Sequence, residues 1–491
     1  MSVTPEVDKI DVEAVNNRRK RSLYKARQAI HPMRVSGTFR RLKWWIMGVT
    51  LAIYYITPWI RWNRGPGVPD QAVLIDLEHR RFFFFFIEIW PQEFYYVAGL
   101  LIMAGIGLFL VTSVLGRAWC GYTCPQTVWV DLFVHVERFI DGDRNARFRL
   151  DKAPWGFTKI RKRLSKYLIW VLIGVATGGA WVFYFADAPT LFVDLFTGEA
   201  SSVAYTTVAI LTATTFIFGG MMREQVCTYM CPWPRIQAAM LDENSLTVTY
   251  NDWRGEPRGR HRKTADAARL GDCIDCNQCV AVCPMGIDIR DGSQLECINC
   301  ALCIDACNNV MAKTGGTPDL ISYTSLNSYE TAAEGGTPPP VRKTIFRPRT
   351  LVYTSIWAAV GVAMLAVLIS RDRLDINVLA DRNPRYVQLS DGQIRNGYTI
   401  KILNMEQQAR RVLLQVSGIP DALMTVAGQD LWPSRTREFE LEADKVLSLK
   451  VFVAAPREQL EPGENPFSFS VTDLVGIEQA HYGARLYAPE D

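Results

Sequence analysis

Residues 273–284 read Cys-Ile-Asp-Cys-Asn-Gln-Cys-Val-Ala-Val-Cys-Pro, and residues 297–307 read Cys-Ile-Asn-Cys-Ala-Leu-Cys-Ile-Asp-Ala-Cys. Both stretches have the spacing C-x-x-C-x-x-C-x-x-x-C, and only the second lacks a proline after its last cysteine, having Asn308 there. Three closely spaced thiolates can cover one face of an iron–sulfur cubane, and a cysteine from elsewhere closes the fourth corner. The duplication therefore predicts two [4Fe–4S] clusters.

In the two-cluster ferredoxin pattern, the fourth cysteine of each stretch ligates the cluster of the other stretch. The spacing assigns the first cluster to Cys273, Cys276, Cys279 and Cys307, and the second cluster to Cys297, Cys300, Cys303 and Cys283. A pair of zinc sites is the alternative interpretation. Zinc knuckles use two cysteine pairs separated by a longer gap, so duplicated triplets followed by Pro284 fit zinc poorly.

A second cysteine motif, C-x-Y-x-C-P, also occurs twice, at 120–125 and at 227–232. Each copy follows an apolar run, which indicates an internal repeat of a membrane hairpin. Cysteines at positions i and i+4 are expected to share one helical face, and two hairpins packed by pseudosymmetry would bring four thiols together. These candidate site residues are Cys120, Cys124, Cys227 and Cys231. Two or three thiolates suit Cu(I), whereas four suit a further iron–sulfur or tetrahedral metal site.

Five apolar runs are long enough to cross a bilayer, which takes roughly 20 residues as a helix. They lie near 44–61, 95–115, 167–186, 203–222 and 350–370. Basic residues are concentrated in the N-terminal 43 residues and in 144–166. Because Lys and Arg favour the cytoplasmic side, the N-terminus is expected inside and the C-terminus outside. All twelve cysteines then face the reducing compartment.

Composition excludes several classes of function. A net charge of +4 over 491 residues gives no indication of a nucleic-acid partner. The chain has no G-x-G-x-x-G after a strand and no P-loop, so nucleotide chemistry has no support. It also lacks the C-x-x-C-H motif of covalent haem.

After residue 371 the sequence contains no cysteine and alternates apolar with polar residues, as in Val446–Val453. About seven short strands separated by Gly, Pro, Asn and Asp predict an all-β immunoglobulin-like sandwich. The expected fold is thus a multi-domain membrane protein: a five-helix transmembrane bundle with an inserted α+β 2[4Fe–4S] ferredoxin domain and this sandwich. The expected parts are a basic segment 1–43, a transmembrane region 44–249, a ferredoxin domain 250–320, a linker 321–349, a fifth span 350–370 and the sandwich 371–491.

With these motifs in this order, the chain resembles the CcoG/FixG/RdxA family of cytochrome oxidase accessory proteins. The resemblance covers nearly the whole chain. It implies a role in assembly of a cbb-type haem–copper oxidase, with reduction of Cu(II) to Cu(I) at the four cysteines of the C-x-Y-x-C-P motifs and cluster ligation by the eight others. It also implies location in the bacterial inner membrane, with the ferredoxin domain cytoplasmic and the sandwich periplasmic.

The expected partners are the bilayer, a copper ion, oxidase-assembly or copper-delivery proteins, and an electron donor that is a quinol or a cytoplasmic reductase. Two other functions fit the same sequence. One is a quinol-oxidising electron-transfer subunit that never binds copper, and the other is a non-enzymatic assembly scaffold.

Overall fold

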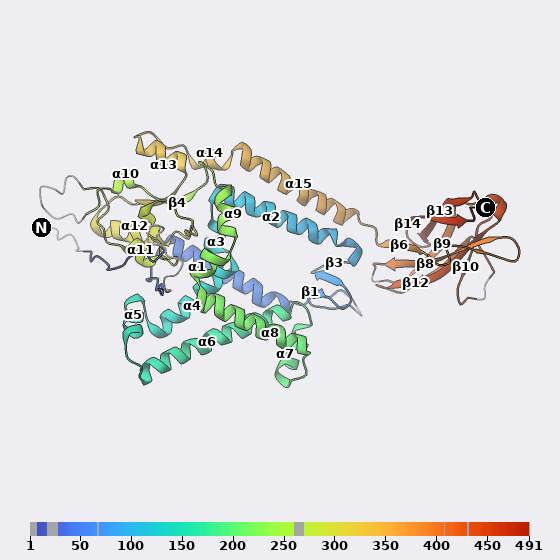
Figure 1. Cartoon of the computed structure of the whole chain (residues 1–491), viewed down its shortest axis with the longest axis horizontal. Helices are drawn as coiled ribbons and strands as arrows, with labels where there is room; N and C mark the ends of the chain where they lie inside the picture. The colour runs from blue at the N-terminus through green and yellow to red at the C-terminus, as the bar shows by residue number, and fades with distance from the viewer. Residues whose placement is uncertain are drawn as a thin grey trace. The chain divides into compact units, whose positions relative to one another are not determined.

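The computed structural model describes residues 7–16, 28–65, 68–259, 270–406, 408–429 and 432–490. Part of the basic N-terminal segment, including Arg18–Arg21, and residues 260–269 lie outside the described residues. The chain forms two compact units, residues 1–364 and 365–491. The cysteine-rich segment is not a separate unit, because it packs on the helices of the first (Figure 1).

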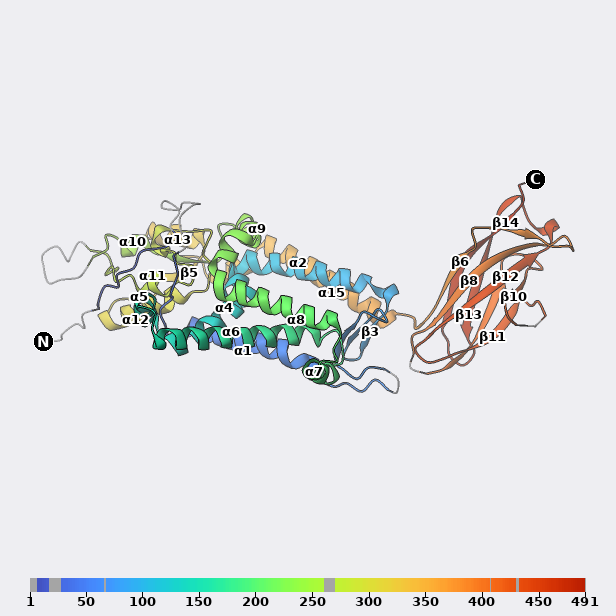
Figure 2. The same ribbon diagram turned by 60° about the horizontal axis from the view of Figure 1, so that its bottom comes forward.

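Long helices build most of the first unit. They are α1 (Thr38–Ile56), α2 (Tyr95–Leu115), α6 (Phe157–Val182), α8 (Ser202–Thr215) with its π-helical continuation η4 (Phe216–Met222), and α15 (Pro348–Ser370). Helices α6 and α8 lie side by side in both views (Figures 1 and 2). Gly174 and Gly178 of α6 allow this close approach, since a Cβ on Gly178 would lie 2.9 Å from the carbonyl oxygen of Val208.

Among the described residues, four helices are long and apolar enough to cross a membrane: Pro91–Leu115, Phe157–Val182, Ser202–Met222 and Pro348–Ser370. They coincide with the second to fifth predicted spans. The predicted count of five is not confirmed. Helix α1 is present, but it begins at Thr38 and carries Arg40, Arg41 and Lys43 in its first two turns, so its apolar part is shorter than the other four.

Shorter elements connect the long helices. They are η2 (Thr57–Trp59), η3 (Pro91–Glu93), α3 (Ala118–Tyr122), α4 (Pro125–Asp141), α5 (Arg144–Lys152), α7 (Ala188–Thr197), η5 (Val226–Met230) and α9 (Trp233–Met240). Strands β1 (Val73–Asp76), β2 (Arg81–Phe84) and β3 (Ile87–Ile89) form an antiparallel sheet between α1 and α2 in the chain. Five consecutive phenylalanines, Phe82–Phe86, lie in this sheet and its following turn, and this run is too short to span a bilayer.

The ferredoxin segment lies at one end of the long helices in both views (Figures 1 and 2). It contains strands β4 (Thr247–Tyr250) and β5 (Ile321–Thr324), which pair antiparallel, and helices α10 (Asp252–Gly255), α11 (Gln278–Val282), η7 (Ile289–Asp291), α12 (Leu302–Thr314), α13 (Leu326–Ala333) and α14 (Val341–Ile345). The N-terminal segment packs along it, since the amide of Ile10 donates to the carbonyl of Cys276 at 3.1 Å.

The second unit is a β-sandwich, as the alternating pattern predicts. One sheet has the order β10-β12-β8-β6 with β7 paired to β8, and the other has the order β11-β9-β13-β14. The strands are β6 (Leu374–Ala380), β7 (Val387–Gln388), β8 (Ile394–Asn404), β9 (Arg410–Ser417), β10 (Leu423–Val426), β11 (Thr436–Leu441), β12 (Val446–Ala455), β13 (Gly463–Asp473) and β14 (Gln479–Ala488), with the short helix η8 (Arg457–Gln459). Inward-facing side chains of both sheets, such as Ile400 and Phe469, form a continuous core.

Candidate functional site

The two cysteine stretches of the ferredoxin segment adopt matching loop conformations. The residue before and the residue after the second cysteine of each triplet have positive φ: Asp275 (54°) and Asn277 (59°) in the first, and Asn299 (53°) and Ala301 (58°) in the second. Positive φ is uncommon outside glycine and marks a functional constraint. Each loop leads into a helix, α11 or α12. The sequence repeat is therefore also a structural repeat.

The eight cysteines of this segment line two cavities. One cavity is lined by Cys273, Cys276, Cys279 and Cys307. The other is lined by Cys283, Cys297, Cys300, Cys303 and also Cys279. Cys307 thus joins the first triplet and Cys283 joins the second. The structure brings the cysteines together in the swapped arrangement that the spacing predicts.

Thiol electrostatics show the same grouping. Burial, with the neighbouring Cys276 and Cys273, raises the pKa of Cys307 to about 12. Burial, followed by the neighbouring Cys300, likewise raises the pKa of Cys283 to about 12. Thiols with such a high pKa are protonated at neutral pH, so metal binding must displace their protons.

The donor set and spacing fit iron–sulfur clusters better than zinc. Within the described ranges, no group of three or more Cys, His, Asp or Glu side chains is placed to hold a single metal ion. A zinc site would require four sulfurs about 2.3 Å from one atom. Each cavity is instead lined by the cysteines of one triplet together with the last cysteine of the other stretch, which is the ligand pattern of a two-cluster ferredoxin.

Arg290 fixes the outside of the first loop. Its guanidinium is almost completely buried and donates to the carboxylates of Asp288 (2.7 Å) and Asp275 (2.9 Å) and to the side-chain oxygen of Asn277 (2.8 Å). Two of these partners are the residues with positive φ. The arginine therefore holds the unusual backbone on both sides of Cys276.

The two C-x-Y-x-C-P motifs also share one backbone conformation. Four residues before its first cysteine, each preceding helix ends at a residue with positive φ: Gly116 (φ 57°, ψ −128°) after α2, and Arg223 (φ 47°, ψ −111°) after η4. One helical turn then carries the first cysteine. The second cysteine is extended, with ψ 127° at Cys124 and 125° at Cys231.

This conformation corrects one prediction. The two cysteines of a motif do not share a helical face, because α3 ends at Tyr122 and Cys124 is the N-cap of the next helix. The cause is the following proline, which disfavours the α conformation in the residue before it. The bend at each proline separates the second cysteine from the helical turn that carries the first.

The four cysteines of these motifs nevertheless lie near one another. Cys120 and Cys227 belong to one apolar cluster, which also includes the buried Cys300 of the ferredoxin segment. Burial, followed by the charges of Cys124, Cys120 and Cys231, raises the pKa of Cys227 to about 12. Burial raises the pKa of Cys120 to about 11, and its sulfur lies 3.0 Å from the side-chain oxygen of Gln237 in α9.

The first motif packs directly against the second ferredoxin loop. A Cβ on Gly121 would lie 2.6 Å from the carbonyl oxygen of Ile298 and 3.1 Å from the Cα of Cys300, so only glycine fits. The hydroxyl of Tyr122 donates to the carbonyl of Cys300 at 3.2 Å. No solvent layer separates this motif from the loop that carries the second cluster's cysteines.

A buried ion-pair network positions the second motif against the helix that follows the first. Glu137 of α4 pairs with Arg147 (2.8 Å), Lys166 (3.2 Å) and Arg223 (3.0 Å). These three cations hold the pKa of Glu137 at about 2, although burial alone would raise it. Because Arg223 closes η4, the network fixes the turn that leads to Cys227.

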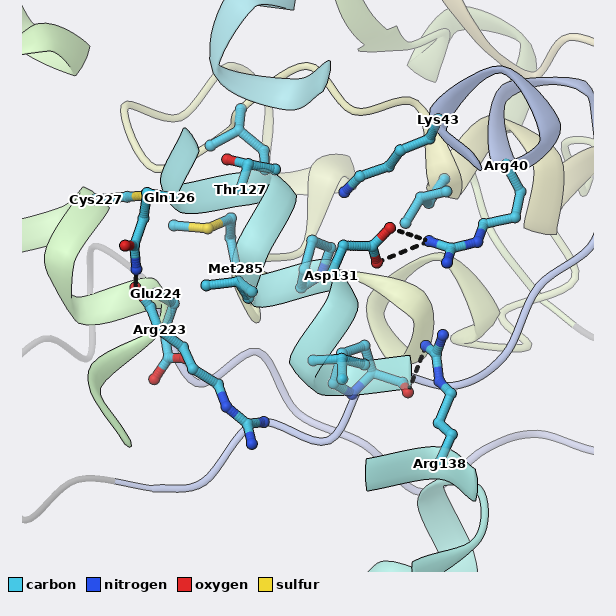
Figure 3. A pocket seen from close by; sticks show the side chains of 16 residues that line it. Arg40, Lys43, Gln126, Thr127, Asp131, Arg138, Arg223, Glu224, Cys227 and Met285 are labelled. Carbon is cyan, nitrogen blue, oxygen red and sulfur yellow. Dashed lines mark hydrogen bonds and ion pairs between the residues drawn. The ribbon is translucent and has the colours of Figure 1, made fainter. Parts of the chain in front are cut away.

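A cavity lies beside Cys227, between α1, α4 and the ferredoxin segment (Figure 3). Its polar lining includes four basic side chains, Arg40, Lys43, Arg138 and Arg223, and two acidic ones, Asp131 and Glu224. Arg40 donates to both carboxylate oxygens of Asp131, at 2.9 and 3.0 Å. The polar lining of this cavity therefore holds more basic than acidic side chains, and Arg40 is neutralised by Asp131.

The site includes residues that the cysteine spacing does not reveal. Gln237, Arg290 and Glu137 have no motif of their own, and each becomes significant only through its contact with a motif residue. Gly121 and Tyr122 are different, because they lie inside a quoted motif. Their position between two cysteines is the sequence signal that could have identified them.

Comparison with known proteins covers nearly the whole chain. The nitrogen fixation protein FixG of Rhizobium meliloti is 60% identical over 98% of this chain and 97% of its own length. Proteins RdxB and RdxA of Cereibacter sphaeroides are 55% and 52% identical, over 94% and 92% of this chain and 96% and 93% of their own lengths. The chain belongs to the FixG/RdxA family.

Three family models match this FixG family member. A 4Fe-4S binding domain matches residues 97–141, a 4Fe-4S dicluster domain matches 222–326, and the Ig-like fold at the C-terminus of FixG matches 364–489. The first model contains Cys120 and Cys124, and the second contains the other ten cysteines. With four apolar helices, this FixG family protein is a membrane-associated iron–sulfur electron-transfer protein.

Proposed function

We propose that this chain reduces Cu(II) to Cu(I) at the C-x-Y-x-C-P cysteines, using electrons from its ferredoxin segment, for assembly of a cbb-type haem–copper oxidase. The observation that supports it most directly is the packing of Gly121 and Tyr122 on the backbone of Cys300. Copper held by the motif would be next to the cysteines of the second cluster.

In this proposal the ferredoxin cysteines hold two [4Fe–4S] clusters, which supply one-electron chemistry when bound. The first set is Cys273, Cys276, Cys279 and Cys307, and the second is Cys297, Cys300, Cys303 and Cys283. The surrounding apolar core excludes water from both sets. Arg290 and the N-terminal segment hold the first loop in place.

Copper enters the proposal as a substrate that visits the motif cysteines. No three described side chains are preset around one ion, so two sulfurs at a time would contact it. One electron from the reduced protein converts Cu²⁺ to Cu⁺, and thiolates favour the softer product. The second motif offers an approach for the ion, because Met230, next to Cys231, is half exposed and contributes a soft thioether.

The remaining assignments belong to the same proposal. A quinol or a cytoplasmic reductase supplies the electrons, and an oxidase-assembly or copper-delivery protein receives Cu(I). The ferredoxin segment faces the cytoplasm and the sandwich faces the periplasm, as the basic residues near the spans favour. This arrangement keeps all cysteines in the reducing compartment.

A resident third cluster is a second candidate role for the motif cysteines. The motif at 120–125 lies inside a 4Fe-4S binding domain, but its two cysteines alone cannot complete a cubane. Cys227 and Cys231 would have to supply the other two ligands, and Cys227 packs in the same apolar cluster as Cys120. Iron analysis of anaerobically purified protein distinguishes the two, because a third cluster adds four irons to the eight of the ferredoxin segment.

Copper reduction is tested with full-length protein that is reduced, freed of excess reductant and mixed with Cu(II). A chelator that absorbs only when bound to Cu(I) measures the product. The double variant C227S/C231S should form no Cu(I) and keep the electron paramagnetic resonance signals of the ferredoxin clusters. The control Gly105→Ala in α2, where an added Cβ meets nothing within 4 Å, should retain activity.

Two results would contradict the proposal. If wild-type protein forms no Cu(I), the chain is an electron-transfer subunit or a scaffold. If C227S/C231S still reduces copper, the reaction takes place elsewhere. Oxidase assembly in cells whose protein lacks the ferredoxin cysteines would identify the scaffold role, because a scaffold does not need the clusters.

A further inference from the structure

The tip of the β13–β14 hairpin in the sandwich exposes an apolar surface. Leu474, Val475 and Ile477 are 43%, 82% and 101% exposed. Val475 and Ile477 are largely uncovered and Leu474 is half covered, although the sandwich has its own complete core. The hairpin therefore presents them to something outside the sandwich.

The tip is rigid. The amide of Val475 donates to the carboxylate of Asp473 at 3.0 Å, and the amide of Leu474 donates to the carbonyl of Arg411 at 2.9 Å. The amide of Asp473 donates to the carbonyl of Glu478 across the turn, at 3.0 Å. These bonds hold the backbone of the turn on both sides of Val475, which lowers the entropic cost when the tip binds a surface.

The tip lies at the end of the sandwich where the chain enters from helix α15. Only three residues separate Ser370, the last residue of α15, from Leu374, the first residue of β6. Leu374 pairs with Asn404. The chain can span at most about 3.6 Å per residue, so this end of the sandwich cannot be far from the end of the helix.

Ion pairs connect the entry point to the hairpin. Arg373 pairs with Glu406 at 3.3 Å, and Glu406 pairs with Arg410 at 2.6 Å. Arg410 in turn pairs with Glu478, at 2.5 Å. Three contacts thus join the residue just after the span to the residue beside Ile477.

We infer that Leu474, Val475 and Ile477 insert into the interfacial layer of the bilayer that α15 crosses. This inference depends on the membrane span and not on copper reduction. Lipid is the occupant that the structure favours, because chain connectivity and the ion pairs both place the tip near the end of the span.

The test is photo-crosslinking of the full-length protein in nanodiscs of phosphatidylethanolamine and phosphatidylglycerol. A benzophenone amino acid replaces Ile477 in one variant and Val387 in the control. Val387 is also exposed, but it pairs with Arg395 at the opposite end of the eleven-residue strand β8, about 30 Å from Asn404. Both sites are on the surface, so neither replacement disturbs the core.

Mass spectrometry should find lipid adducts at position 477 and several-fold fewer at position 387. Equal yields at the two positions, or adducts only to protein at position 477, would overturn the inference. Hydrogen exchange is the second measurement. In nanodiscs, the amides at 475–478 should exchange more slowly in the wild-type protein than in the variant V475D/I477D. Equal exchange rates in the two proteins would also overturn the inference.

Discussion

The hydroxyl of Tyr122 donates a hydrogen bond to the backbone carbonyl of Cys300, with 3.2 Å between the two oxygens. One residue lies in a C-x-Y-x-C-P motif and the other in the ferredoxin segment, 178 positions later. This contact joins two cysteine groups that the sequence presents as separate. The copper proposal can therefore be tested at the interface between the motif at 120–125 and the ferredoxin loop that carries Cys300.

The interface predicts that Gly121→Ala is damaging. The added methyl group would lie 2.6 Å from the carbonyl oxygen of Ile298, and relief of such overpacking costs about 1–3 kcal/mol. We expect a lower unfolding temperature and slower copper reduction. The control is Gly105→Ala in α2, where a Cβ meets nothing within 4 Å and should not destabilise the helix. Equal effects of the two substitutions would argue against the interface.

Tyr122→Phe removes the hydroxyl that donates to the carbonyl of Cys300 and that also interacts with the hydroxyl of Tyr323. We expect a loss of about 1 kcal/mol in unfolding free energy, with both ferredoxin clusters still present in the electron paramagnetic resonance spectrum. The rate of Cu(I) formation should fall. An unchanged rate would show that this hydrogen bond does not contribute to electron transfer.

The swapped cysteine sets predict how pairs of substitutions combine. C273S/C307S removes two ligands from one proposed set, so about half of the iron and one cluster signal should remain. C273S/C283S removes one ligand from each set, and we expect both signals to weaken. If C273S/C307S lost both clusters while C273S/C283S kept one, the sets would follow sequence order instead. Iron analysis and electron paramagnetic resonance provide the readout.

The low pKa of Glu137 predicts that the first unit loses stability in acid. Its folded-state pKa of about 2 is below the ordinary 4.5, so its contribution is complete above pH 4.5 and is lost as the pH falls towards 2. The slope approaches about 1.4 kcal/mol per pH unit. Unfolding temperatures between pH 7 and pH 3.5 measure it. E137Q should be less stable at pH 7, because three cations lose a partner, and its stability should depend less on pH. If the unfolding temperatures of the wild type and E137Q changed equally with pH, Glu137 would not be the group responsible.

The Arg40–Asp131 pair predicts a large cost for removing one partner. Both side chains are less than 10% exposed, and an unpaired buried charge typically costs about 3–5 kcal/mol. We expect D131A to lower the unfolding temperature strongly. The control is D70A at the exposed Arg61–Asp70 pair, where we expect less than about 1 kcal/mol. Thermal unfolding in detergent compares D131A with D70A. Similar decreases in their unfolding temperatures would contradict the prediction.

The sequence alone determined the features that depend on local spacing. Cysteine triplets, apolar runs of about twenty residues and period-two alternation each predict one element, because ligation, bilayer thickness and strand pleating fix those periods. The second to fifth spans and the sandwich agree with the structure. The first predicted span is not confirmed, because α1 is present but its first two turns carry charged residues that shorten its apolar stretch.

Only the tertiary structure decided which residues from distant parts of the chain are in contact. Tyr122 and Cys300, Glu137 and Arg223, and Arg410 and Glu478 are far apart in the chain, so no periodicity relates them. Local spacing also gave a wrong arrangement within the C-x-Y-x-C-P motif, where proline makes Cys124 extended. Contacts between distant segments depend on how complete elements pack, which short-range patterns do not encode.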